Sequence, residues 1–395
     1  MVKRVIATTV CILLFLLFVS AEGEKILSTY NPDYMNIMSI GAKPNDGEDD
    51  TEFFLMAMRA GKTIYVPAGV FNVTETIELQ SLNLVGAGSD KSVIESSADS
   101  SIKPIVQADR TVVIRDIGLR FREDLLTGQE RMGERVGIRC GGLQWSLQRG
   151  SSFTNISISN VGTGIYTAAL DEDETNCAFS VTFESISVVD FTFRGIDFQS
   201  PRTGNIYRNI YVSSGKYTAD SGFNMTKVES ETDMNELTVA YSKLRMPVRF
   251  FEMQALAVTN LNIISTELTN DNTGFVYVDC SAGYIEGLNF INSVPDTAKK
   301  SYLRIGDNIY NTYRYGNLGY LRIGAMNIMN GESDTKMDPE SYFISRKNAY
   351  MNEYTVEIEH YNYMAADDQK ELYEAFRHNE KAFTLIKPAK GGNAQ

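Results

Sequence analysis

A loose repeat runs through the middle of the chain and limits the folds that this sequence can adopt. Each copy reads apolar, any residue, small polar, Ile or Leu, any residue, apolar. The copies occupy residues 114–119, 153–158, 183–188, 207–212, 234–239, 258–263 and 285–290. A unit of about 25 residues cannot bury its own apolar side chains, so units of this kind must stack to share one core.

A second pattern accompanies the first and begins another strand after a turn. It pairs Gly with an apolar residue at 164–165, 195–196, 222–223 and 274–275. Alternating apolar and polar residues point to opposite faces of a strand, so the apolar anchors are expected inside and the polar residues outside. The two patterns together predict a solenoid of short strands. A leucine-rich repeat, which is more regular and richer in Leu, and a jelly roll or sandwich are the alternatives.

The region before the repeats reads as a cap. Residues 37–47 predict a strand and a polar turn, and residues 50–60 predict a helix that Asp49 or Asp50 caps and Gly61 ends. Residues 63–71 then predict a strand that breaks at Pro-Ala-Gly. Near the other end of the chain, residues 365–383 predict an amphipathic helix that covers the open end of the solenoid.

The segment from Ser39 to Phe71 resembles the opening of the pectate-lyase-like superfamily. Its members share a GA-x-G-D-G-x-x-D-D-T segment, a capping helix and a G-x-V-Y-x-P-x-G-x-Y strand; here Pro44-Asn45 replaces the first Gly of the turn and Phe71 stands for Tyr. The resemblance implies a right-handed parallel β-helix with three faces, capped by the N-terminal helix. The superfamily includes polysaccharide lyases, hydrolases related to glycoside hydrolase family 28, epimerases and tailspikes. The catalytic motif set of the polygalacturonases does not carry over to this chain.

The sequence divides into four parts. Residues 1–21 resemble a secretory signal peptide, with basic Lys3 and Arg4, an apolar stretch at 5–19 and small residues before the cleavage site; an uncleaved anchor is the alternative. Residues 22–35 form a leader, residues 36–335 the β-helix domain, and residues 336–395 a C-terminal capping segment and tail. No later stretch is long and apolar enough to cross a bilayer, so a secreted protein without membrane association is expected.

Charge and histidine content exclude several functions. The chain has 37 Lys and Arg against 50 Asp and Glu, a net charge of −13, which argues against a nucleic-acid partner. Its two histidines, His360 and His378, both lie near the C-terminus. Chemistry in the body of the solenoid must therefore rely on carboxylates, Arg and Lys.

Cysteines and sequons add little constraint. After signal cleavage Cys140, Cys177 and Cys280 remain, an odd set without C-x-x-C spacing, so neither a disulfide framework nor a zinc site is expected, although one pair could bridge. No cofactor is predicted. A calcium site is the alternative, and its oxygen ligands would come from Asp271, Asn272, Asp279 and Glu286. The glycosylation sequons begin at Asn72, Asn155 and Asn224.

The candidate catalytic residues are Asp190, Asp197 and Asp220. Successive coils of a β-helix lie about 4.8 Å apart, so carboxylates one or two coils apart approach the separations of glycosidase pairs. Asp190 shares its offset from the repeat with Asn160, Ser214, Ser265 and Asn292. A turn residue is the alternative for Asp190, and a surface ion pair is the alternative for the other two.

The candidate substrate-binding residues are Arg194, Arg202, Lys243, Arg245 and Tyr217. Lys243 and Arg245 alternate, so both would face the same way, and with Arg249 they could bind a uronate or supply a lyase base; a solvated face is the alternative. Tyr217, like Tyr207 and Tyr211, could stack on a sugar ring or in the core.

These observations favour a secreted carbohydrate-active protein that binds a polysaccharide. Hydrolysis is slightly favoured over lyase chemistry because candidate carboxylates are easier to name than a base. The alternative is a non-catalytic glycan-binding or structural β-helix of a virion or cell surface, for which a homotrimer is expected.

Overall fold

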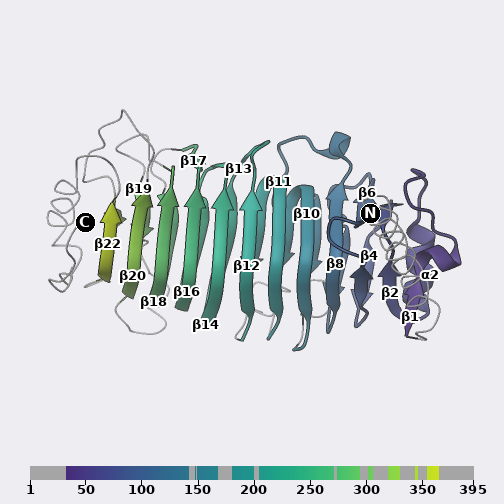
Figure 1. Cartoon of the computed structure of the whole chain (residues 1–395), viewed down its shortest axis with the longest axis horizontal. Coiled ribbons are helices and arrows are strands. Elements are labelled where there is room, and N and C mark those ends of the chain that lie inside the picture. The colour runs from purple at the N-terminus through teal and green to yellow at the C-terminus, as the bar shows by residue number, and fades with distance from the viewer. Residues whose placement is uncertain are drawn as a thin grey trace, which may run out of the picture.

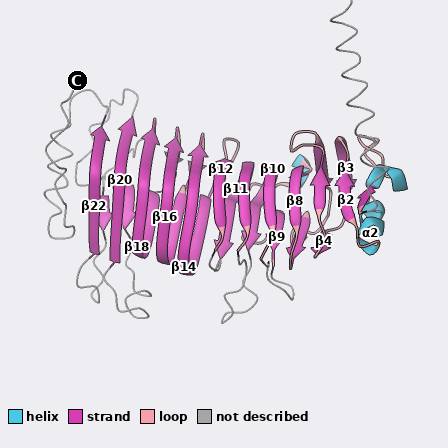
Figure 2. Cartoon of the chain, turned by 60° about the horizontal axis from the view of Figure 1, so that its bottom comes forward, coloured by secondary structure: helices cyan, strands magenta, loops and turns pink. Residues whose placement is uncertain are grey.

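Parallel strands stack along one long axis in the computed structural model, with helix α2 (Thr51–Arg59) at one end and strand β22 (Tyr354–Tyr363) at the other (Figure 1). Turning the molecule shows the same row of coils, closed by α2 at the N-terminal end (Figure 2). The structure describes residues 33–141, 147, 149–167, 180–199, 204–270, 274–293, 301–305, 319–329, 343–345 and 354–363. The fold is the right-handed parallel β-helix that the sequence predicts.

The elements follow one another in a regular order. The remaining helices and strands are β1 (Tyr34–Asn36), η1 (Ile37–Ile40), β2 (Thr63–Val66), β3 (Gly69–Val73), β4 (Ile77–Gln80), β5 (Leu84–Gly86), β6 (Ser92–Ser96), β7 (Val106–Asp109), β8 (Val113–Phe121), η2 (Glu123–Leu125), β9 (Val136–Cys140), β10 (Ser152–Thr167), β11 (Thr182–Gln199), β12 (Ile206–Ser213), β13 (Thr218–Ala219), β14 (Ser221–Ala240), β15 (Lys243–Leu244), β16 (Val248–Ile264), β17 (Glu267–Leu268), β18 (Gly274–Ile291), β19 (Ser301–Ile305), β20 (Gly319–Met329) and β21 (Phe343–Ser345).

The seven repeat copies stack in register. Their first anchors pair from strand to strand in the order Ile114, Phe153, Phe183, Tyr207, Met234, Val258 and Ile285. All seven side chains are buried. The repeat is therefore one coil of the solenoid, as its inability to fold alone predicts.

The second pattern also stacks, with one displacement. Ile165 pairs with Ile196, which pairs with Phe223. Phe275 falls out of this line because Val276, the next residue, occupies the position. In β18 the Gly-apolar pair is therefore displaced by one residue, although Phe275 is still buried.

Two corners divide each long strand into three faces. Asn155 and Ser185 form the first corner of β10 and β11, and Asn160 and Asp190 form the second; all four have φ between +49° and +55°. Residues other than Gly seldom adopt this left-handed conformation, and Asn and Asp tolerate it best because their side chains bond locally. Asp190 is thus a corner residue, in agreement with the turn interpretation.

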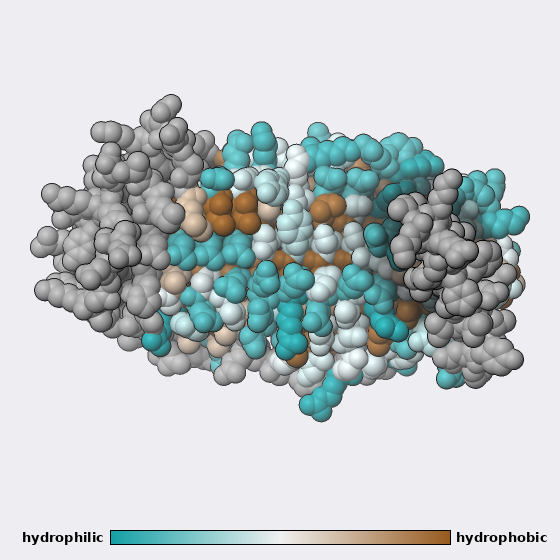
Figure 3. Space-filling model, in the orientation of Figure 1, coloured by the Kyte–Doolittle hydropathy of each residue, from teal (hydrophilic) through white to brown (hydrophobic). Residues whose placement is uncertain are grey.

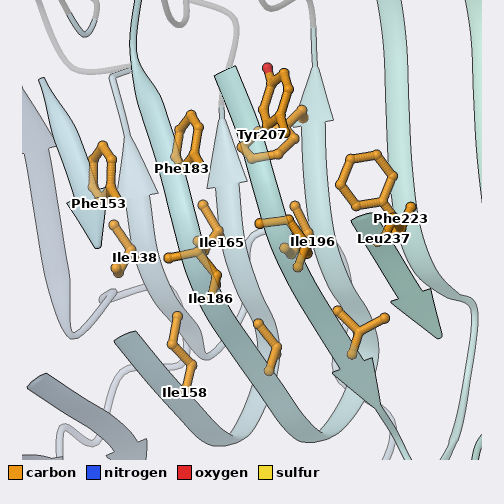
Figure 4. Close-up of a cluster of buried hydrophobic side chains, with 14 of the residues drawn as sticks. Ile138, Phe153, Ile158, Ile165, Phe183, Ile186, Ile196, Tyr207, Phe223 and Leu237 are labelled. Carbon is orange, nitrogen blue, oxygen red and sulfur yellow. The ribbon is translucent and has the colours of Figure 1, made fainter. Parts of the chain in front are cut away.

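Aromatic rings stack along the interior. The ring centroids of Phe153 and Phe183 are 4.8 Å apart with an interplanar angle of 10°, and those of Phe183 and Tyr207 are 5.5 Å apart with an angle of 5° (Figure 4). Tyr207 therefore belongs to the core and is not available for a sugar ring. Burial raises the pKa of its hydroxyl above the usual value.

The N-terminal motif is explained by hydrogen bonds around α2. Asp49 Oδ1 accepts from the Thr51 backbone N–H at 3.0 Å, and its Oδ2 accepts from Thr74 Oγ1 at 2.7 Å. Asp50 Oδ1 instead accepts from the Lys43 backbone N–H at 3.1 Å. Asn45, which replaces Gly, adopts φ +62°, so Asn serves here because it tolerates the left-handed conformation.

The solenoid continues past residue 335, where the sequence analysis ended it. β21 pairs with β19 and β22 pairs with β20, all in parallel. The predicted signal peptide and the helix expected at 365–383 lie outside the described residues. In the part of the chain that is described, no helix has both the length and the apolar character needed to span a membrane.

Candidate functional site

One outward ladder collects unusual side chains on the face formed by the last part of β10 and β11 and the first part of β14, β16 and β18. In successive coils it contains Tyr166, Asp197, Asn224, Arg249 and Tyr277. These residues directly follow the inward Ile or Phe or Val of the second pattern, so alternation turns them outward. The ladder brings a carboxylate, an amide and a guanidinium into adjacent coils, about 4.8 Å apart.

Arg194 joins two of the predicted carboxylates. Its Nη1 lies 2.8 Å from Asp197 Oδ2, and its Nε lies 2.8 Å from Asp220 Oδ2. Asp197 is on β11, whereas Asp220 precedes β14 in the next coil. The side chain of Asp197 is fully buried and that of Asp220 is 26% exposed, so only Asp220 offers accessible carboxylate surface.

Polar partners surround Asp197 on both sides. Asn224 Nδ2 donates to Asp197 Oδ1 at 2.6 Å, and Gln199 Nε2 donates to Oδ2 at 3.3 Å. Among the described residues, Asn224 Oδ1 and Ser221 Oγ are buried without a hydrogen-bond partner. A buried polar atom without a partner costs about 1–3 kcal/mol, so these two atoms reduce the stability of this part of the fold. We call Arg194, Asp197, Asp220 and Asn224 the Arg194 cluster.

The carboxylates of the cluster and the burial of Arg194 have opposite effects on the pKa of its guanidinium. Burial alone would lower the pKa of Arg194, but Asp197 and Asp220 outweigh this effect and raise it. The neighbouring Arg249 has a lowered pKa, chiefly because it is buried, and its guanidinium lies 4.5 Å from the centroid of the Phe251 ring. The charge of Arg194 is thus balanced by two carboxylates, whereas nearby carboxylates do not offset the burial of Arg249.

An insertion between β8 and β9, residues 122–134, leans along the solenoid toward the cluster. Glu130 Oε2 accepts from Thr192 Oγ1 at 2.5 Å, and Gln199 Nε2 donates to Met132 Sδ at 3.0 Å. Lys216 pairs with Glu123. Figure 1 shows η2 and its loop above β8, β10 and β11. The insertion therefore contacts residues on both sides of Arg194 in sequence and forms one border of the site.

The other predicted binding residues lie at different distances from the cluster. Arg245 Nη1 is 4.0 Å from Asp220 Oδ1, so the structure brings Arg245 to the site. Lys243 instead pairs with Glu267 at 3.3 Å, with both side chains 60% exposed. Tyr217 is half-buried, and the Nζ of Lys216 lies 5.5 Å from its ring centroid. Arg202 lies outside the described residues.

Asp190 is not part of the cluster. It occupies the second corner of β11, before the strand turns onto the face that carries Asp197. Within the described ranges, no ion pair or hydrogen bond joins Asp190 to Arg194, Asp197 or Asp220. Its offset matches turn positions in neighbouring coils because the corner repeats, not because chemistry repeats.

The three sequons occupy different environments. Asn72 is half-buried on β3, and Asn155 donates from Nδ2 to Asp116 Oδ1 at 2.8 Å. Asn224 is buried, with its Nδ2 directed to Asp197. Glycosylation at all three remains a prediction. The side chain of Asn224 is also a hydrogen-bond partner of Asp197, which its sequon does not indicate.

Metal and thiol candidates are dispersed. In the described part of the chain, no group of three or more His, Cys, Asp and Glu side chains is arranged to hold a metal ion. Asp279 and Glu286 both lie on β18, Asp279 buried and Glu286 exposed, while Asp271 and Asn272 lie outside the described residues. Cys140 and Cys280 are separate buried thiols on β9 and β18, and Cys177 is not described.

The fold and the charged outward ladder define the class: a right-handed parallel β-helix with a polar site on one face. Residues 34–247, more than half of the chain, match the family described as rhamnogalacturonase A/epimerase, pectate lyase-like. The chain belongs to this family, which confirms the resemblance in its N-terminal segment. It is therefore a β-helix of a carbohydrate-active family.

Two solved structures illustrate the likeness. The chain is similar to the Agl-KA catalytic domain, with a TM-score of 0.53, 13% identity and coverage of 91% of this chain and 68% of that one. It is also similar to the catalytic domain of a GH87 α-1,3-glucanase in complex with nigerose, with a TM-score of 0.51, 12% identity and coverage of 92% and 70%. At such identities the likeness shows the fold alone. No curated protein sequence matches the chain.

Several residues of the site escaped sequence reasoning. The sequence marks Asn224 only as a sequon, and no sequence pattern singles out Gln199, Glu130 or Thr192. A signal for Asn224 existed, because it follows Gly-Phe as Asp197 follows Gly-Ile. Glu130 had no such signal, since its contact with Thr192 joins residues 62 positions apart across coils.

Proposed function

We propose that this protein degrades a polysaccharide outside the cell, and that hydrolysis is the reaction that the Arg194 cluster supports best. The observation that carries the proposal is the bonding of Asp197 and Asp220 to a single guanidinium. Hydrolysis needs a carboxyl group beside the glycosidic bond, and Asp220, which is 26% exposed, is the accessible carboxylate of the cluster. The family match adds the carbohydrate class.

The two carboxylates would have different roles. Asp220 is partly exposed and would contact the sugar, whereas the buried Asp197 would position Arg194 and Asn224. Both carboxylates are bonded to Arg194 in the unbound protein, so substrate binding would have to separate Asp220 from the guanidinium before Asp220 acts on the sugar.

Lyase chemistry is the second candidate, and Arg249 favours it. β-Elimination needs a base beside the sugar, and burial lowers the pKa of Arg249 in the coil next to Asn224. Arg245 would then bind the uronate carboxylate. The same residues could also bind a glycan without cleaving it, the role expected of a structural or surface β-helix, for which a homotrimer is proposed. Export by residues 1–21 is part of both proposals, and neither requires a cofactor.

A glycan panel tests the proposal. The purified protein is incubated with plant, algal and microbial polysaccharides, and the products are measured as new reducing ends and as the ultraviolet absorbance of unsaturated sugars. Hydrolysis gives only the first signal and elimination gives both. Asp220→Asn should abolish product formation, and Asp233→Asn, the same change at an exposed position of β14, should not.

The outcomes separate the candidates. No product from any glycan would refute an enzymatic function, and retention on a glycan without product would identify a binding protein. Equal rates for Asp220→Asn and Asp233→Asn would remove the Arg194 cluster as the active site. Loss of elimination in Arg249→Lys, with hydrolysis retained on another substrate, would separate the two chemistries.

A further inference from the structure

From β10 to β20, the described outward side chains on a face that does not carry the Arg194 cluster are uncharged; in the coil before, Arg120 of β8 is aligned with Ser159. This face lies between the two corners, and its outward residues form two parallel rows along the axis. Across β10, β11, β12, β14, β16, β18 and β20, the first row is Ser157, Ser187, Tyr211, Thr238, Asn262, Asn289 and Asn327. The second row, two residues further along each strand, is Ser159, Val189, Ser213, Ala240, Ile264, Ile291 and Met329.

Composition alone does not account for this surface. The chain has 22% charged residues, which would place about three charges among these fourteen positions. The neighbouring faces are charged: Glu184 and Arg208 precede the first corner in β11 and β12, and Asp197 and Arg249 follow the second. Charge is therefore absent along this face from β10 to β20, over roughly 29 Å, the six steps between seven strands.

Its C-terminal half is a ladder of amides beside a row of aliphatic side chains. Asn262 Nδ2 donates to Thr238 Oγ1 at 3.2 Å, Asn289 Nδ2 donates to Asn262 Oδ1 at 2.9 Å, and Asn327 Nδ2 donates to Asn289 Oδ1 at 2.7 Å. Ile264, Ile291 and Met329 are half-buried. Figure 3 shows this hydrophobic row directly beside a hydrophilic one. We call these two rows, from β14 to β20, the amide face.

The ladder leaves hydrogen-bonding capacity. A side-chain amide has two N–H donors and an oxygen that accepts two bonds. Within the described structure, Asn262 and Asn289 each use one donor and one acceptor position in the ladder, and each keeps one N–H and one lone pair. Donors and acceptors thus recur about every 4.8 Å along the axis, next to apolar surface.

We propose that the amide face is a second polysaccharide-binding surface that takes a neutral glycan chain parallel to the solenoid axis. Hydroxyl groups donate and accept, as the amides of Asn262 and Asn289 require, and the C–H surface of a sugar ring packs on Ile264 and Ile291. A neutral chain fits because no guanidinium or ammonium on the face would bind an anionic one. The proposal rests on the carbohydrate function proposed above, but it places binding away from the Arg194 cluster.

The size of the face favours a polymer chain over a second copy of the protein. Two rows across one strand are roughly 7 Å apart, so even the full uncharged face covers only about 200–300 Å². A stable protein interface needs about 800 Å² from each partner. A single extended chain needs only a narrow strip, which is what the two rows supply.

The test measures retention on neutral polysaccharides. Affinity electrophoresis through gels that contain galactomannan or dextran, and co-sedimentation with insoluble α-1,3-glucan, report the dissociation constant. Asn289→Asp keeps the shape of the amide but removes its N–H donors and adds charge, and Ile291→Lys adds charge while leaving the ladder intact. Asn235→Asp, at an exposed position before the first corner of β14, is the matched control.

We expect Asn289→Asp and Ile291→Lys each to raise the dissociation constant about tenfold, and Asn235→Asp to leave it unchanged. Thermal melts of all variants show whether each is folded, and Ile291→Lys keeps the test valid if Asn289→Asp is not. Equal retention of all variants, no retention of the wild type on any of the three polymers, or a lower oligomer mass in the face variants would each overturn the proposal.

The result can be separated from that of the proposed function. Asp220→Asn should lose product formation yet keep retention, whereas Ile291→Lys should lose retention yet keep its rate on short oligosaccharides. If no glycan is cleaved but retention still depends on Ile291, the enzymatic proposal fails and the second binding surface stands.

Discussion

Replacing Arg194 by Met should destabilise the protein strongly, because it leaves a buried carboxylate without a counter-charge. Asp197 is fully buried and Arg194 is 15% exposed, so water cannot replace the guanidinium. Removing one partner of a buried ion pair costs about 3–5 kcal/mol. Asn224 and Gln199 would still donate to Asp197, which places the expected loss near the lower end of this range.

A double-mutant cycle isolates the cause. Asp197→Asn together with Arg194→Met removes the unpaired charge and keeps the side-chain shape, so the double variant should recover about 2 kcal/mol relative to Arg194→Met alone. Arg115→Met is the control, because Arg115 lies 3.7 Å from Asp116 and the two side chains are 48% and 33% exposed. A surface pair of this kind contributes about 0–1 kcal/mol.

Urea unfolding followed by far-ultraviolet circular dichroism measures these differences, provided that the slope with denaturant is unchanged among variants. The reasoning is refuted if Arg194→Met costs no more than Arg115→Met. It is also refuted if the two cluster substitutions are additive, because the energetic coupling through the buried charge would then be absent.

Three further perturbations test other parts of the structure. Asp190→Ala should cost about 1 kcal/mol in unfolding free energy, because Ala tolerates φ +53° poorly, and should leave glycan cleavage unchanged; a loss of activity in folded protein would restore Asp190 to the active site. Burial would raise the pKa of Glu130, but hydrogen bonds from Thr192 and Thr127 outweigh it and lower the pKa below 4.5. The ionised Glu130 therefore stabilises the insertion fully above pH 4.5, and this stabilisation is lost as the pH falls through the pKa of the folded state. Hydrogen exchange at residues 122–134, corrected for intrinsic rates, should become faster at that low pH and also in Glu130→Gln at pH 7. Unchanged protection of these residues in both experiments would contradict the prediction. Gly195→Ala should cost about 1–3 kcal/mol in urea unfolding because its Cβ would lie 2.4 Å from a carbonyl oxygen of the next coil. Gly215→Ala should cost less, because its Cβ would lie 3.2 Å from the Tyr241 carbonyl oxygen, and equal effects would argue against the close approach.

The stacking of coils could be predicted because it depends on inward side chains that the sequence repeats. Ile186 and Ile210 occupy the same place in their coils, and their spacing survives loops of unequal length. The grouping of Arg194 with Asp197 and Asp220 was also within reach, since an Asp beside an Arg in adjacent coils suggests a pair. The burial of Asp197 could not be predicted from the sequence, because it depends on side chains from three coils and from the insertion.

Register explains most of the misses. Asn224 reaches Asp197 only when β14 is aligned on β11, and the alignment depends on intervening loops whose length the repeat does not fix. The displacement of Phe275 has the same origin. Outward ladders such as the amide face become visible only after several coils are in register, because each coil contributes one residue to each row.

The insertion changes how this solenoid should respond to stress. In a simple array each coil contacts only its neighbours, so unfolding can start at an end and proceed coil by coil. Residues 122–134 connect β8 to β9, and they contact three residues that follow β10 in the chain: Thr192, Gln199 and Lys216. Coils from β8 to β13 should therefore open as one cooperative block, which contains Arg194 and Asp197, whereas Asp220 and Asn224 directly follow it. Fraying from the N-terminal end, by heat, force or proteolysis, would reach the site only after that block unfolds.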